Sequence, residues 1–156
     1  APPIHGRRPA GKGKVRTMWN SRRQGPEVTT KQRGDAAEDA ALAHLQRHGL
    51  RLVQRNFRTP GRGGGEVDLI MREPDGTLVF VEVRQRASAS RGGAGASITG
   101  IKQRRIVFAA RHFLLRLGSE PPCRFDVVLL QGSQQHTDPG QDIEWLRAAF
   151  DASGTF

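Results

Sequence analysis

The segment from Glu66 to Arg84 decides the fold, and it reads EVDLIMREPDGTLVFVEVR. Two of its runs are rich in apolar and β-branched residues, and they predict β-strands at Glu66 to Arg72 and at Thr77 to Gln85. The turn-forming residues 73–76 separate the two runs, so the segment is expected to form a β-hairpin. The second run is apolar on both faces up to Glu82, which is typical of a strand that is buried on both sides of a sheet.

The length of the turn decides whether two acidic residues of this hairpin meet. Side chains alternate between the faces of a strand, so Asp68 shares a face with Ile70, and Glu82 shares a face with Phe80. A three-residue loop, which a positive φ at Gly76 permits, places Asp68 directly opposite Glu82, whereas a two-residue loop places them on opposite faces. Opposed carboxylates repel, and a divalent cation with oxygen ligands can neutralise them. A hydrogen-bonded or arginine-paired carboxylate pair is the structural alternative.

Apolar periodicity along the rest of the chain predicts further elements around this hairpin. They are a helix from Asp35 to a stop at Gly49, a strand at Leu50 to Asn56, a helix at Ile101 to Leu117, a strand at Arg124 to Leu130, and a last strand or short helix at Ile143 to Phe150. This order of elements predicts an α/β fold with a mixed sheet and helices on its faces.

Positive charge is concentrated at the N-terminus. Residues 1–33 carry nine Lys or Arg and one acidic residue, whereas residues 34–156 carry 16 basic and 14 acidic residues. We therefore expect a disordered basic tail at 1–33, a folded domain at 34–150 and a flexible C-terminus at 151–156. The tail either is only a solubilising or upstream extension or attracts phosphates without sequence preference, and the sequence leaves both open.

Several classes of protein are excluded or disfavoured by composition. No apolar run approaches the roughly 18 residues of a membrane helix, and the N-terminus has no apolar core of a secretory signal. The single cysteine, Cys123, excludes an intrachain disulfide and is expected to be a small core hydrophobe. We therefore expect a cytoplasmic protein with no membrane association.

Glu38 is a candidate third carboxylate. Leu42 and Leu45 follow it at helical spacing, so all three share the helix face that meets the sheet. Glu38 either closes a capping box with Asp35 or contributes to the acidic site, and the two roles are compatible.

Five short motifs now stand in order along residues 31–150. They are Gly34-x-x-x-Glu38, Arg55-Asn56-Phe57-Arg58, Gly65-Glu66-Val67-Asp68-Leu69-Ile70, Val79-Phe80-Val81-Glu82-Val83-Arg84 and Arg124-Phe125-Asp126-Val127-Val128. Each motif alone is weak, but the combination resembles the bacterial UPF0102 (YraN-type) family.

The resemblance implies a restriction-endonuclease-like fold, similar to that of archaeal Holliday-junction resolvases, with a mixed sheet flanked by helices. It also implies a metal-dependent endonuclease that acts on structured or branched DNA. Carried over to this chain, Asp68, Glu82 and Glu38 would bind Mg²⁺ or Mn²⁺, and Glu66 would be an auxiliary ligand. By analogy with resolvases, a homodimer would supply two sites for paired cuts.

The chain departs from the superfamily's Glu-x-Lys motif at Arg84, where a lysine is expected. Arginine stays protonated and cannot be a general base, but it can hold a scissile phosphate or stabilise transition-state charge. Lys102 could replace the lysine if it reached the site, although the sequence favours a cation on a solvated helix face. Lys102, Arg104 and Arg105 are candidates for nucleic-acid backbone contacts. A catalytically impaired nucleic-acid-binding module is the alternative function.

Overall fold

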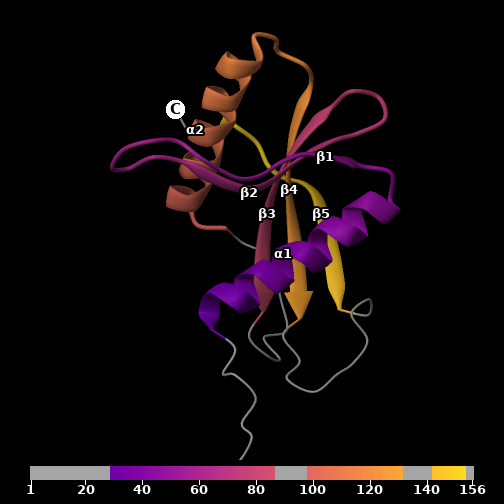
Figure 1. Ribbon diagram of the computed structural model, residues 1–156. Helices are drawn as coiled ribbons and strands as arrows, with labels where there is room; N and C mark the ends of the chain where they lie inside the picture. Colours follow the sequence, from indigo (N-terminus) through magenta and orange to yellow (C-terminus); the bar gives the residue numbers. More distant parts are fainter. Residues whose placement is uncertain (1–28, 87–97, 132–141, 154–156) are drawn as a thin grey trace, which may run out of the picture.

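The computed structural model describes residues 29–86, 98–131 and 142–153, which form a five-stranded mixed sheet with one helix on each face (Figure 1). The elements are α1 (Thr30–Arg47), β1 (Arg51–Arg58), β2 (Glu66–Arg72), β3 (Leu78–Arg86), α2 (Gly100–Leu117), β4 (Cys123–Gln131) and β5 (Ile143–Phe150). The strands lie in chain order, and β3 and β4 are parallel because α2 connects them, whereas the other pairs are antiparallel. The predicted α/β class is confirmed, and the architecture is consistent with a restriction-endonuclease-like fold. Most of the predicted basic tail (1–28) and residues 154–156 lie outside the described ranges.

The β2–β3 hairpin has the register that a three-residue loop predicts. Leu69 pairs with Val81, and each further pair towards the turn follows the same spacing. The Glu73 N–H donates to the Thr77 carbonyl at 2.9 Å, which leaves residues 74–76 as the loop. Gly76 has φ of 94°, a left-handed conformation that glycine adopts without strain. The odd-length turn that the acidic pair requires is therefore present.

Strand β3 is buried from both sides, as its sequence predicted. On the α2 side, Phe80 packs edge-on against Phe113 with ring centroids 6.1 Å apart. On the α1 side, Val79 and Val81 pack in a second cluster with Leu45 of α1. The two apolar clusters hold one helix against each face and fix the position of β3 between them.

Helix α1 begins earlier than the sequence predicted. The side chain of Thr29 accepts the Gln32 N–H at 3.2 Å, and the Gln32 side chain accepts the Thr29 N–H at 2.9 Å. This reciprocal capping box starts the helix at Thr30, so the predicted start at Asp35 and its capping box with Glu38 are wrong. Glu38 lies inside the helix and is left available for another role.

The last predicted segment is the edge strand β5 rather than a helix. Asp126 of β4, which is fully buried, ties β5 to the sheet. It accepts hydrogen bonds from Arg124 Nε, Trp145 Nε1 and the Ala148 N–H, each at 2.9 Å. Asp126 is therefore a structural acid, paired with Arg124 within β4.

Two expectations about composition have different outcomes. Cys123 is exposed, not in the core, because it stands at the first position of β4, directly after two prolines. Neither helix that the structure describes is long and apolar enough to cross a membrane.

Candidate active site

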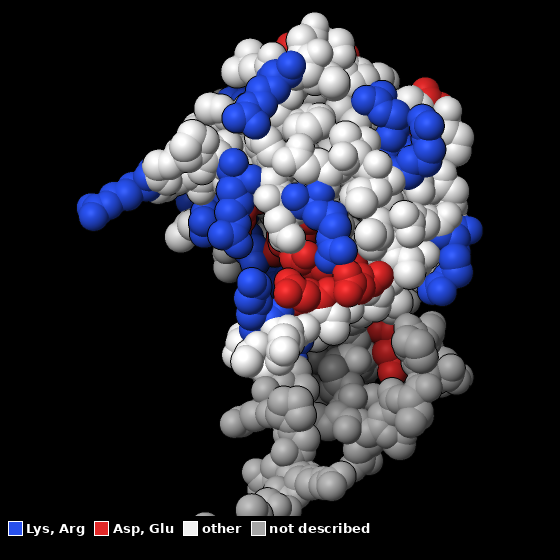
Figure 2. Space-filling model, viewed as in Figure 1, with Lys and Arg blue, Asp and Glu red and all other residues white. Residues whose placement is uncertain are grey.

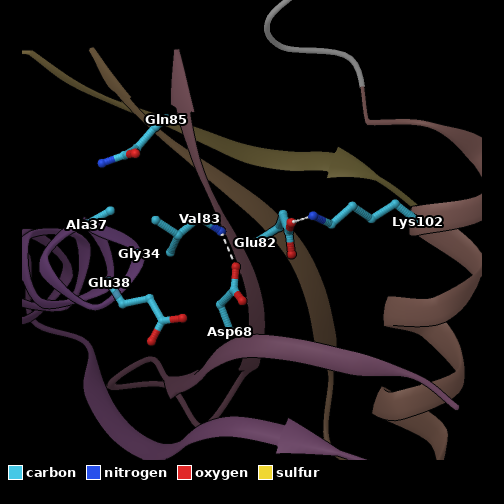
Figure 3. A pocket seen from close by; sticks show the side chains of 8 residues that line it. All are labelled: Gly34, Ala37, Glu38, Asp68, Glu82, Val83, Gln85 and Lys102. Atoms are coloured by element: carbon cyan, nitrogen blue, oxygen red, sulfur yellow. Dashed lines mark hydrogen bonds and ion pairs between the residues drawn. The ribbon is translucent and has the colours of Figure 1, made fainter. Parts of the chain in front are cut away.

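A cavity of about 240 Å³ lies where α1, the hairpin and the first turn of α2 meet (Figure 3). Three carboxylates and one ammonium group reach it, and they come from four different elements. Its lining residues are Gly34, Ala37, Glu38, Asp68, Glu82, Val83, Gln85 and Lys102. The cavity therefore gathers Asp68, Glu82 and Glu38, the three acidic residues that the sequence selected as principal ligands.

Asp68 stands where the ladder between β2 and β3 ends. The paired residues run up to Leu69 and Val81, and the next backbone donor, the Val83 N–H, is bound by Asp68 Oδ2 at 2.8 Å. The side chain thus fills the place of a ladder partner, and this hydrogen bond holds one of its oxygens against β3. Burial, and then the charge of Glu82, raise the pKa of Asp68 to about 7. The site therefore holds a carboxylate whose negative charge is costly.

Glu82 is almost fully buried, with 2% of the side chain exposed, and it is bound by a lysine from α2. Lys102 Nζ lies 2.5 Å from Glu82 Oε1. The interpretation of Lys102 as a solvated cation was therefore wrong, although 42% of its side chain is exposed. The sequence could not give this contact because it depends on how α2 is placed against β3.

Gly65 brings α2 close enough for this contact. A Cβ atom at Gly65 would lie 2.2 Å from the Arg105 carbonyl oxygen and 2.6 Å from the Ala109 nitrogen, so only glycine allows the approach. Arg105 Nε also donates to the Gly64 carbonyl at 3.2 Å. The start of β2 and the N-terminal half of α2 are thus packed backbone to backbone, beside the cavity.

Glu38 enters the cavity from α1, and 13% of its side chain is exposed. Arg55 of β1 holds it through a 3.4 Å contact and also binds Asp39 at 2.7 Å. Burial and the negative charge of Asp68 raise the pKa of Glu38, although hydrogen bonds from Arg55 and Asn56 oppose this effect. Arg55 is a positioning residue that the sequence did not single out, although it lies in one of the quoted motifs.

The remaining predicted site residues do not line the cavity. Glu66 lies beside it and faces Arg58 at 3.6 Å and Arg105 at 4.0 Å. Arg104 is exposed on α2, and Arg84 is half-buried on β3. Gln85 and Gly34, in contrast, do line the cavity and were not selected as site residues. Gly34 had a signal, since it precedes Glu38 by one helical turn.

The acidic groups form a close pair and a more distant third member. Asp68 and Glu82 interact directly, whereas Glu38 is drawn towards Arg55. Among the described residues, no group of three or more His, Cys, Asp or Glu is arranged as a metal-binding set. The donor set offered to a cation is therefore two carboxylates, with a third, that of Glu38, entering from α1.

Charge is arranged unevenly around this side of the molecule. Figure 2 shows acidic side chains gathered near the centre of the viewed face, with Lys and Arg side chains on several sides of them. Helix α2 itself carries five Lys or Arg and no Asp or Glu. A cationic helix beside an acidic cavity can attract a polyanion. One phosphate of that polyanion could then lie close to the carboxylates.

Comparison with known proteins shows close relatives. The chain matches the family model described as uncharacterised protein family UPF0102 over residues 37–130. A UPF0102 protein of Polaromonas naphthalenivorans (strain CJ2) is 69% identical over 128 residues, covering 81% of this chain and 84% of the relative. A UPF0102 protein of Albidiferax ferrireducens is 68% identical over 124 residues, covering 80% and 91% respectively. The chain belongs to the UPF0102 family.

Proposed function

We propose that this protein is a metal-dependent endonuclease that hydrolyses phosphodiester bonds in structured or branched DNA. The observation that carries the proposal is the pairing of Asp68 with Glu82, beside a lysine, at the point where β2 and β3 separate. A buried acidic pair has no advantage for the stability of the sheet, and carboxyl groups with raised pKa values are typical of functional sites.

The acidic pair fits a hard divalent cation such as Mg²⁺ or Mn²⁺. Magnesium commonly binds through one or two carboxylates, keeps several waters and takes further oxygens from a phosphate substrate. Asp68 and Glu82 would hold the cation, and its charge would offset the burial and the repulsion by Glu82 that raise the pKa of Asp68. When bound, such a cation supplies Lewis-acid stabilisation of the phosphate and an activated hydroxide nucleophile.

The chain's own residues would orient the reacting groups. The Val83 N–H binds one oxygen of the Asp68 carboxylate and limits the rotation of that group. The second oxygen would therefore stay directed towards the cavity. Glu38, held by Arg55, would accept a hydrogen bond from a water that enters the cavity, or add a ligand. Arg84 would orient the scissile phosphate from β3, outside the cavity lining, and Glu66 would act as an auxiliary acid, also outside it.

Helix α2 would contact the DNA backbone. Lys102, Arg104 and Arg105 lie in its first two turns, next to the cavity, and phosphate contacts position a substrate without reading its sequence. A homodimer would present two such sites for paired cuts in a branched substrate. Measurement of the particle mass by light scattering, alone and with a DNA junction, tests the dimer.

The direct test is cleavage of labelled junction, flap and linear DNA by the full chain with Mg²⁺ or Mn²⁺. We expect cleavage by the natural protein and only background cleavage by Asp68→Asn, which keeps an oxygen for the Val83 N–H. The matched control is Asp35→Asn, which removes an exposed acid of α1 and should cleave normally. Equal cleavage by Asp68→Asn and the natural protein would refute the catalytic assignment.

A non-catalytic nucleic-acid-binding module is the second candidate. Arg84 in place of the motif lysine favours it, because arginine stays protonated and cannot act as a general base. It predicts DNA binding that needs no metal and falls steeply with salt. A large gain of cleavage in Arg84→Lys would mark the natural protein as impaired, whereas a loss would mark Arg84 as a working part of the site.

A further inference from the structure

The lysine that the superfamily motif places on β3 has a spatial counterpart on α2. Arg84 stands at the motif position but does not line the cavity, whereas Lys102 lines it and contacts Glu82 at 2.5 Å. In Figure 3 the Lys102 side chain extends from α2 towards the Glu82 carboxylate. Lys102 is therefore the basic side chain among the residues that line the cavity.

We propose that Lys102, rather than Arg84, is the basic residue of this carboxylate site, and that it competes with a divalent cation for Glu82. The identity of the cation rests on the function proposed above. The competition itself rests only on the contact between Lys102 and Glu82.

The burial of the two partners explains why they compete. A carboxylate that is 2% exposed needs a positive partner, because an ionised group without one is very costly in the protein interior. The side chain of Lys102 is 42% exposed, so its ammonium group can move into solvent at modest cost when another cation takes Glu82. Lys102 is thus a counter-ion that another cation can replace, whereas the Glu82 carboxylate stays buried in the site.

The backbone of Lys102 is held in place, although its ammonium group can move. The Thr99 side chain accepts the Lys102 N–H at 3.2 Å and caps the first turn of α2. Because Gly65 has no Cβ, the next turns of α2 can pack directly against the start of β2. A displaced Lys102 ammonium would therefore stay at the cavity wall, where a phosphate oxygen of a substrate would be its nearest new partner. Lys102 is then a positioning residue for Glu82 that becomes a phosphate contact.

Isothermal titration calorimetry of Mn²⁺ binding to the full chain, without DNA, tests the competition. We expect Lys102→Met to bind Mn²⁺ about fivefold to tenfold more tightly than the natural protein, because the competing ammonium is gone. Arg111→Met removes one exposed charge from the same helix and should change the Mn²⁺ affinity less than twofold. Glu82→Gln should bind Mn²⁺ weakly whether position 102 carries lysine or methionine. Lys102→Gln repeats the test if Lys102→Met fails to fold.

Cleavage by the same variants separates this inference from the proposed function. Lys102→Met should cleave DNA at least tenfold more slowly although it binds Mn²⁺ more tightly. A lysine with a merely structural role would not change the cleavage rate and the Mn²⁺ affinity in opposite directions. Arg84→Lys combined with Lys102→Met should recover none of the cleavage, because position 84 does not line the cavity. If no variant cleaves but Lys102→Met still gains Mn²⁺ affinity, the nuclease proposal fails and the competition stands. Unchanged, weaker or absent Mn²⁺ binding in Lys102→Met would overturn the competition.

Discussion

Replacing Asp68 by Asn should stabilise the fold at neutral and alkaline pH. Asp68 is buried against Glu82, and the Val83 N–H is its one hydrogen-bond donor from the backbone of β3. Asparagine keeps an acceptor for that N–H and has nearly the same shape. The substitution therefore removes little except the charge, and the charge is the costly part of the site.

The size of the gain follows from the pKa. Burial and Glu82 raise the pKa of Asp68 from 3.8 to about 7 in the folded protein, so the unfolded chain loses this proton first as pH rises. Ionisation then favours the unfolded state increasingly from about pH 4 to pH 7, and the full difference corresponds to about 4 kcal/mol. The charge of Lys102 lowers this pKa and is already included in its value, so we expect Asp68→Asn to gain up to about 4 kcal/mol at pH 8.

Urea unfolding at pH 4.5, 6 and 8, with a chelator present, measures this difference in the free energy of unfolding. Asp68→Asn should match the natural protein near pH 4.5 and exceed it increasingly up to pH 8. Asp35→Asn, an exposed acid of α1, should show no such trend. Mn²⁺ in place of the chelator should narrow the difference between the two proteins, because it stabilises only the natural protein. A difference that stays constant with pH, or a destabilised Asp68→Asn at pH 8, would refute the reasoning.

Three further predictions follow from the same structure. Asp126→Ala leaves three donors of a buried network without an acceptor and should cost about 3 kcal/mol or more of unfolding free energy, measured by urea titration. Gly65→Ala forces a Cβ into the backbone of α2 and should cost about 1–3 kcal/mol, whereas Gly34→Ala, which meets nothing within 4 Å in α1, should gain about 0.5–1 kcal/mol. Arg104→Ala should lower DNA affinity and reduce the slope of log affinity against log salt by about one, measured by fluorescence anisotropy.

Local rules predicted the hairpin because its register depends on a few adjacent residues. The turn at 74–76 is short, and Gly76 accepts the left-handed conformation that an odd-length loop needs. Once that loop is set, strand alternation brings Asp68 and Glu82 together without further information. The two most important acids of the site were therefore readable from one segment of sequence.

The contacts that come from other elements could not be read in this way. Lys102 reaches Glu82 because Gly65 permits α2 to approach β2, and no periodicity reveals that distance. Arg55 reaches Glu38 because β1 lies at the edge beside α1. The start of α1 was missed for a different reason, since the capping box of Thr29 and Gln32 extends the helix through Gly34, a residue that is unfavourable inside helices.

Two buried carboxylates in the same sheet show how a structural acid differs from a candidate functional one. Asp126 is surrounded by donors, with an arginine, an indole N–H and a backbone N–H all within 2.9 Å, so its burial is compensated within the fold. Asp68 faces a second carboxylate, lines a cavity and has a raised pKa. An acid whose neighbours increase the cost of its charge does not serve stability, and this cost marks Asp68, unlike Asp126, as a candidate for a functional role.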